Sequence, residues 1–272
     1  YRLAEDRYML MTAWGSNAAG ERPEYELLLE HSRGRNAWVF DASPGVCLVA
    51  LQGPNSRDLL SELTDAQLDG LAYMWALPAR IAGIRALVGR TGYTGELGFE
   101  ILVPVEHAHD FWAALMEAGE NYGLSPCGMI AAFSLRMEKG YIMRFDFAGG
   151  RTPYELGLGW TVKLDKGDFI GRDALLRRKE AGFEEKLVLV AVQDGHVPLG
   201  GDPLLLKGEQ VGAVTSAAYG YTVGAGLALA YLPNSLAVLG TEITIQDKDG
   251  NPHPAVVGKR SPYDPEGTRL RV

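Results

Sequence analysis

The chain contains 272 residues, of which 47% are hydrophobic and 22% are charged, and its formal net charge is −8. Nucleic-acid-binding surfaces are basic, so this charge argues against nucleic acid as a partner. No apolar run reaches the roughly eighteen residues of a membrane-spanning helix, and the opening YRLAEDRYMLM is too polar for a signal segment. Cys47 and Cys127 form no CxxC pair, so we predict two buried thiols and no metal site. We therefore expect a cytoplasmic protein without a membrane partner.

The first part of the chain mixes strand and helix patterns. Apolar runs predict strands at 1–13, 37–43 and 46–54, and two more strands around a glycine-rich turn within 79–104. Helical spacing of apolar residues predicts helices at 21–35, with Pro23 in the first turn, and at 55–64, 106–123 and 127–139. We expect Asn55 or Ser56 to cap the second helix, and Gly34 and Gly140 to end the first and the fourth. This order fits an α+β domain, in which helices cover one face of an antiparallel sheet.

The pattern changes at about Glu185. The following segments, such as KLVLVAV, are short and apolar and are separated by Gly, Pro, Asn and Asp turns, with clear hairpin turns at Lys207-Gly208 and Asp249-Gly250-Asn251. We therefore predict an α+β body over residues 1–184 and an all-β domain, a small barrel, over residues 185–272.

One stretch, RTGYTGELGFEIL at residues 90–102, places Gly92, Gly95 and Gly98 three residues apart. A phosphate-binding loop is one interpretation of so many glycines. However, no Gly-Lys-Ser/Thr follows, and the run leads into a strand rather than to a helix N-terminus. The sequence therefore disfavours a phosphate site here.

Glu100 lies in the strand-like part of this stretch. In a strand over 98–103, Glu100 and Leu102 point to one side and the apolar residues around them point to the other. An unpaired buried carboxylate costs several kcal/mol, so Glu100 must be solvated, paired with a cation or bound to a ligand. A carboxylate can accept two parallel hydrogen bonds from a planar amino-pyrimidine, and Tyr93 could supply a ring wall or a hydroxyl to the same cavity.

Six segments of the chain resemble the glycine-cleavage T-protein family and stand in the same order as in that family. They are LQGPNSRDLL, RTGYTGELGFEI, SLRMEKGY, GLGWTVKLDKGDFIGRDAL, VTSAAYGYTVGAGLALAYLP and YDPEGTRLR. The members are tetrahydrofolate-dependent aminomethyltransferases, and their relatives include the folate lobes of dimethylglycine and sarcosine oxidases. The resemblance implies a folate-binding aminomethyltransferase-like α+β body with a C-terminal β-barrel.

The resemblance implies a pterin pocket lined by Tyr93 and Glu100. Trp160, in GLGW, resembles a ring that closes over the folate, and a buried core indole is the alternative. Leu10 and Thr12 match a pocket strand, with threonine in place of the asparagine that is common in the family. Tetrahydrofolate is the implied cofactor.

Two departures from the family pattern separate this chain from the T-protein itself. Ala132 stands where a folate-contacting arginine is common, and MEKGY stands where the T-protein has LEAG. In both features the chain resembles the relatives that are linked to amine oxidases, so we expect it to lie nearer that branch of the family. The folate-binding iron–sulfur assembly proteins have a functional cysteine where this chain has Asp168, so that branch is disfavoured.

The resemblance also implies a segment before Tyr1 that holds the family's aspartate, so we name no catalytic acid within the chain. The implied activity is one-carbon transfer from an N-methyl or aminomethyl compound to tetrahydrofolate. The alternatives are a non-catalytic folate-binding module partnered with a flavin amine oxidase domain or subunit, and an O- or S-demethylase that passes methyl to tetrahydrofolate.

Charge bears on the donor of the one-carbon unit. An acidic protein is a poor electrostatic match for an acidic carrier protein, so we expect a free small-molecule donor. Arg136, Lys139 and Arg144 either neutralise the folate tail or lie on a solvated helix face.

Overall fold

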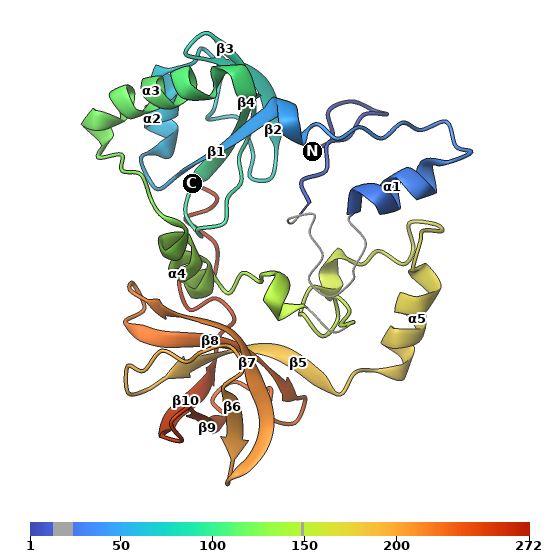
Figure 1. Cartoon of the computed structure of the whole chain (residues 1–272), viewed down its shortest axis with the longest axis vertical. Coiled ribbons are helices and arrows are strands. Elements are labelled where there is room, and N and C mark those ends of the chain that lie inside the picture. The colour runs from blue at the N-terminus through green and yellow to red at the C-terminus, as the bar shows by residue number, and fades with distance from the viewer. Residues whose placement is uncertain (13–23, 148–149) are drawn as a thin grey trace. The chain divides into compact units, whose positions relative to one another are not determined.

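The computed structural model describes residues 1–12, 24–147 and 150–272, which form two compact units (Figure 1). The first unit comprises Tyr1–Gly92, Glu96–Ser125 and Arg271, and the second comprises Tyr93–Gly95, Pro126–Leu270 and Val272. The predicted domain boundary between residues 184 and 185 lies inside the second unit, directly before the first strand of that unit, and it stays a prediction.

The first unit contains a four-stranded antiparallel sheet with the strand order β1-β4-β3-β2. Its strands are β1 (Val46–Gln52), β2 (Ala76–Ile81), β3 (Ile84–Gly89) and β4 (Gly98–Pro104). The sequence predicts two strands within 79–104, whereas β2, β3 and β4 all enter this range. The reason is a tight turn at Ala82 and Gly83, which both have positive φ and join β2 to β3 as a hairpin.

Two helices of this unit, α2 (Ser56–Glu62) and α3 (Ala108–Gly119), cover one face of the sheet (Figure 1). Their apolar sides form the core with alternate residues of β4, and the buried members are Leu59, Leu60, Phe99, Ile101, Val103, Phe111 and Leu115. Asn55 occupies the N-cap position of α2 without capping it, because its side chain donates to the carbonyl oxygen of Tyr122 at 3.2 Å. The other face of β4 therefore carries Glu100 and Leu102, as predicted.

A further helix, α1 (Glu24–Ser32), has no buried residue, and Gly34 follows it with φ 72°. Pro23, the predicted first-turn residue, lies outside the described residues.

Two strand predictions for this unit are wrong. Within the described part of 1–13, the chain turns back on itself, with one isolated bridge between Arg2 and Tyr8, because the polar residues around Glu5 interrupt the apolar alternation. Residues 37–42 form no strand, and Trp38 and Phe40 are 76% and 82% exposed. Both segments have strand-like composition, but neither pairs with the sheet along its length.

The second unit contains α4 (Met129–Lys139), α5 (Arg172–Ala181) and a closed six-stranded barrel with the order β10-β5-β8-β7-β6-β9. The barrel strands are β5 (Glu185–Val192), β6 (Pro203–Leu206), β7 (Glu209–Gly220), β8 (Ala225–Pro233), β9 (Glu242–Gln246) and β10 (Pro252–Gly258). The predicted barrel and its two hairpin turns are confirmed, since β6 meets β7 at Lys207-Gly208 and β9 meets β10 around Gly250. Gly140 ends α4 in the left-handed conformation, as expected.

Both faces of strands β5 and β8 are buried. Alternate residues fill the barrel interior, including Val190, Ala228 and Ala230, while Leu189 and Leu229 pack outside it with Met137 of α4. A strand buried on both faces has a continuous apolar sequence, which explains KLVLVAV and GLALAYL.

Among the described residues, no helix is long and apolar enough to cross a membrane. Cys47 is half-buried and Cys127 is exposed, so the prediction of two buried thiols is wrong for Cys127.

Candidate functional site

Glu100 lies in the middle of the first unit's sheet. It is opposite Ala50 of β1 and Gly89 of β3, on the face away from α2 and α3. The carboxylate is half-buried, and its Oε2 accepts a hydrogen bond from the Tyr1 hydroxyl at 3.0 Å. Of the three environments that the sequence left open, the structure shows partial access to solvent, and the Tyr1 hydroxyl adds a neutral donor. Among the described residues, no cation pairs with Glu100.

Tyr1 reaches Glu100 because Gly89 has no side chain. A Cβ added at Gly89 would lie 2.6 Å from Cε1 of the Tyr1 ring, so any other residue there would displace the ring. Burial, and then the neighbouring Glu100 charge, raise the pKa of the Tyr1 hydroxyl, so it stays protonated and donates. Sequence reasoning missed Tyr1, because only the folded chain brings two residues so distant in sequence together.

The Glu100 carboxylate keeps acceptor capacity in the structure. A carboxylate oxygen has two lone pairs, so the Tyr1 bond leaves acceptor capacity on Oε2. Among the described residues, Oε1 of Glu100 has no hydrogen-bond donor. Both oxygens can therefore accept the parallel N–H donors that a planar amino-pyrimidine presents.

Tyr93 belongs to the second unit and is held at both ends of its side chain. Its hydroxyl donates to the carbonyl oxygen of Ile142, and its ring stacks on Tyr141 with centroids 5.5 Å apart and planes 24° apart. The residue is 40% exposed, and burial of the remainder raises the pKa of the hydroxyl. This arrangement suits a ring that forms one wall of a pocket, because the hydroxyl already donates its hydrogen bond to a backbone carbonyl oxygen.

The other three predicted site residues are exposed. Trp160 lies in a short 3-10 helix, Gly159–Thr161, and is 73% exposed, so its alternative interpretation as a buried core indole is wrong. Leu10 and Thr12 are exposed in the first unit, and the pocket strand expected there is absent from the described part of 1–13. The single folate pocket predicted from the five residues stays a prediction.

Two cationic side chains of the segment SLRMEKGY form ion pairs inside the second unit. Arg136 is 1% exposed and pairs with the buried Asp146 at 3.1 Å, and Lys139 pairs with Asp264 at 3.0 Å. Although burial acts to raise the pKa of Asp264, hydrogen bonds from Thr268 and Lys139 lower it to about 2. The expectation of a solvated helix face is therefore wrong for Arg136 and Lys139, and their buried pairing does not suit them to the folate tail.

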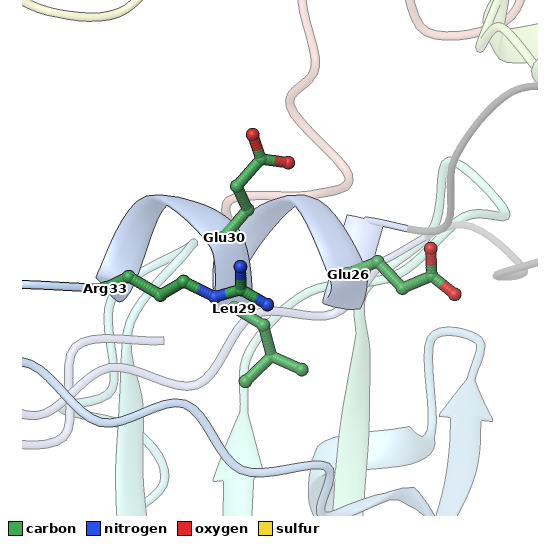
Figure 2. Close-up of a pocket in the computed structure, with 4 residues that line it drawn as sticks. All are labelled: Glu26, Leu29, Glu30 and Arg33. Carbon is green, nitrogen blue, oxygen red and sulfur yellow. The ribbon is translucent and has the colours of Figure 1, made fainter.

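A hollow of about 250 Å³ lies along α1 and is lined by Glu26, Leu29, Glu30 and Arg33 (Figure 2). Glu26, Leu29 and Glu30 belong to this one helix and Arg33 follows its last residue, and none of the four is a predicted site residue. The hollow is formed between neighbouring side chains of a surface helix, and nothing links it to the binding of a folate.

Comparison with solved structures identifies the fold of the chain. The crystal structure of the glycine cleavage system aminomethyltransferase T from Bartonella henselae matches with a TM-score of 0.80 and 26% identity, over 89% of this chain and 65% of that one. The fold is thus that of the glycine cleavage system aminomethyltransferases.

Comparison of sequences gives the family. Residues 1–166 match the GCVT N-terminal domain, and residues 185–264 match the glycine cleavage T-protein C-terminal barrel domain. Proteins named aminomethyltransferase from Streptomyces coelicolor and Halothermothrix orenii are 41% and 38% identical, over 93% and 90% of this chain. The chain belongs to the glycine cleavage T-protein family, whose cofactor is tetrahydrofolate. It spans 68% of the length of each of these two relatives, about two thirds.

The predicted position nearer the amine-oxidase-linked branch lacks comparable support. A chain of the heterotetrameric sarcosine oxidase from Corynebacterium matches with a TM-score of only 0.32, a level at which the likeness carries no argument. The family prediction is confirmed, while the branch within it stays a prediction.

Proposed function

We propose that the protein containing this chain transfers a one-carbon unit from an aminomethyl or N-methyl compound to tetrahydrofolate. The observation that supports this most directly is the match of two family domains along the chain, together with relatives named aminomethyltransferase. An aminomethyl donor is at the oxidation level of formaldehyde, so its transfer would release the amine and give 5,10-methylenetetrahydrofolate. An N-methyl donor would give this product only after a two-electron oxidation, which a partner flavin amine oxidase would supply.

Glu100 would hold the pterin by its amino-pyrimidine edge. Its half-buried carboxylate has acceptor capacity on both oxygens, and Tyr1 limits the rotation of the carboxylate through the 3.0 Å hydrogen bond to Oε2. A charge-assisted pair of parallel hydrogen bonds fixes orientation as well as position. Orientation matters here, because aligned reactants can lower a barrier by several kcal/mol.

Tetrahydrofolate supplies the nucleophilic nitrogens that accept the one-carbon unit. The role of this chain is then to orient the folate and to limit the access of water, which would hydrolyse an electrophilic one-carbon group. Tyr93 would form one wall with its ring, stacked on Tyr141, and Trp160 would supply an exposed indole to cover the ligand.

We further propose that the donor of the one-carbon unit is a free aminomethyl compound. The relatives' name favours an aminomethyl compound, and the net charge of −8 supports a free small molecule over an acidic carrier protein.

Isothermal titration calorimetry of this chain with tetrahydrofolate tests the binding part of the proposal. We expect saturable binding with one site per chain. Glu117→Ala, which changes an exposed glutamate of α3, should leave the affinity unchanged. The absence of binding to both this chain and the complete protein would overturn the proposal.

A further inference from the structure

We propose that Gln52 is a positioning residue for the folate-binding carboxylate, and that Gly92 and Gly98 are glycines because they enclose the Gln52 amide. This inference rests on the proposed function for its ligand, but its geometry lies entirely within the first unit.

Gln52 joins the two ends of the glycine-rich loop. It is the last residue of β1 and pairs with Gly98, the first residue of β4. Its Nε2 donates to the carbonyl oxygens of Thr91 at 3.2 Å and Phe99 at 3.4 Å. One amide group therefore connects the backbone before the loop with the backbone after it.

The two glycines leave room for this amide. A Cβ added at Gly92 would overlap the Gln52 Oε1, and a Cβ added at Gly98 would overlap its Cδ. Neither glycine has positive φ, so conformational freedom does not explain them. Close approach of a neighbouring side chain does, which is the second reason for glycine in a folded chain.

The clasp formed by Gln52, Gly92 and Gly98 bears directly on Glu100. Gly98 and Glu100 are two residues apart in β4, so they face the same side of the sheet. A shift of one residue in the start of β4 would turn Glu100 toward the apolar core and Phe99 away from it. By holding the entry to β4, the amide keeps the carboxylate on the face where it meets Tyr1.

If Gln52 had a structural role alone, its removal would lower stability but would have no specific effect on Glu100. A double-mutant cycle distinguishes this structural role from the positioning of Glu100. We expect Gln52→Ala to weaken tetrahydrofolate binding by about tenfold, because the carboxylate loses part of its fixed position. In a Glu100→Ala background, the same change should weaken binding by less than about twofold, since Gln52 acts through Glu100. Gln67→Ala, which removes an exposed glutamine of the same unit, is the matched control and should have no effect.

An equal tenfold loss in both backgrounds, or unchanged binding in the folded Gln52→Ala variant, would overturn the positioning role. Gln52→Glu keeps the size of the side chain but replaces the donating amide by an oxygen that faces two carbonyl oxygens. It should therefore fail to restore binding, and restoration would also contradict the inference.

A second cycle needs no ligand and measures the free energy of unfolding by urea denaturation. Gly92→Ala should destabilise the parent chain, because the new methyl group displaces the amide, but much less when Gln52→Ala has already removed that amide. Gly45→Ala, at a glycine with ordinary φ and open space around its Cβ position, should cost little in either background. Equal destabilisation by Gly92→Ala in both backgrounds would overturn the clasp. If the parent chain bound no tetrahydrofolate, the proposed function would fail. This cycle would still test whether the Gln52 amide packs against Gly92, because it needs no ligand.

Discussion

Glu100 is a charged residue among apolar neighbours, which is why we propose it as a binding residue. A carboxylate on a strand that is otherwise apolar needs a partner, and its only hydrogen-bond donor among the described residues is the Tyr1 hydroxyl. That single neutral donor leaves most of the acceptor capacity of the carboxylate for a ligand.

Glu100→Ala should therefore weaken tetrahydrofolate binding by about 2–3 kcal/mol, because charge-assisted hydrogen bonds to the pterin are lost. Glu100→Gln should be partly tolerated, since one carbonyl acceptor remains. Calorimetry at constant pH measures both affinities. Unchanged affinity of the Glu100→Ala variant would remove this residue from the site.

Tyr93 allows ring packing to be separated from hydroxyl chemistry. Its hydroxyl already donates to the Ile142 carbonyl oxygen, and its ring stacks on Tyr141. Tyr93→Phe should bind tetrahydrofolate nearly as well as the parent, whereas Tyr93→Ala should bind it poorly. Retained binding with lost turnover in Tyr93→Phe would show that the hydroxyl takes part in the reaction, contrary to its role as a wall.

Residues that act through distant pairing were not predictable from the sequence. Glu100 and Tyr93 stand out locally, one as a charge among apolar residues and the other within a glycine-rich motif. Tyr1 and Gln52 carry no local signal, because their contacts depend on segments that lie far apart in the chain. Only the glycine spacing at 92–98 hinted at the Gln52 contact.

Helix α4 shows at the scale of an element why a motif full of charges can be structural. Arg136 pairs with Asp146, whose carboxylate also accepts hydrogen bonds from the hydroxyls of Thr215 and Ser216. Glu138 accepts from the backbone N–H of Val223 at 3.0 Å. The motif thus fixes the helix to the barrel, which charge spacing alone did not reveal.

Arg136→Ala should lower the free energy of unfolding by about 3–5 kcal/mol, because it leaves Asp146 buried without its cation. Arg177→Ala, at an exposed position of α5, is the matched control and should change stability by less than about 0.5 kcal/mol. Urea denaturation of the two variants measures the difference. Similar stabilities would contradict the structural role of the motif.

Strand β10 carries a histidine that should make barrel stability depend on pH. His253 lies between Asp194 at 2.8 Å and Asp247 at 3.4 Å, and its ring stacks on His196 with centroids 3.6 Å apart. The hydrogen bond to Asp194 and then that to Asp247 raise the pKa of His253, while burial opposes them. The protonated ring can donate to both carboxylates at once.

Because the folded pKa of His253 is raised, its contribution to stability is complete below the unfolded pKa and is lost as pH rises through the folded pKa. The stability difference between the parent and His253→Gln should therefore be larger at about pH 6 than at about pH 8. His109→Gln, at a 97% exposed side chain, should show little such dependence. A difference that grows with pH would contradict this sign.

At the scale of the whole molecule, the barrel was more predictable from the sequence than the body. Glycine-marked hairpins and continuous apolar runs specify β5 to β10 locally, and these strands close into one barrel. In the first unit, strand-like composition at 1–13 and 37–43 was misleading, because a strand also requires a partner. The family resemblance predicted the fold that the comparisons support, but not the contacts around Glu100.

Formation of 5,10-methylenetetrahydrofolate by the complete protein tests the proposed one-carbon transfer most directly. In separate reactions, tetrahydrofolate would be supplied with a free aminomethyl compound, with an N-methyl compound together with a flavin amine oxidase that oxidises it, or with an aminomethyl-lipoyl carrier protein. We predict turnover of about 1 per second or more with a free donor, and its loss in Glu100→Ala at low folate concentration. Turnover with the carrier alone would overturn the choice of donor, and no methylenetetrahydrofolate with any donor would contradict the assignment as a one-carbon transferase.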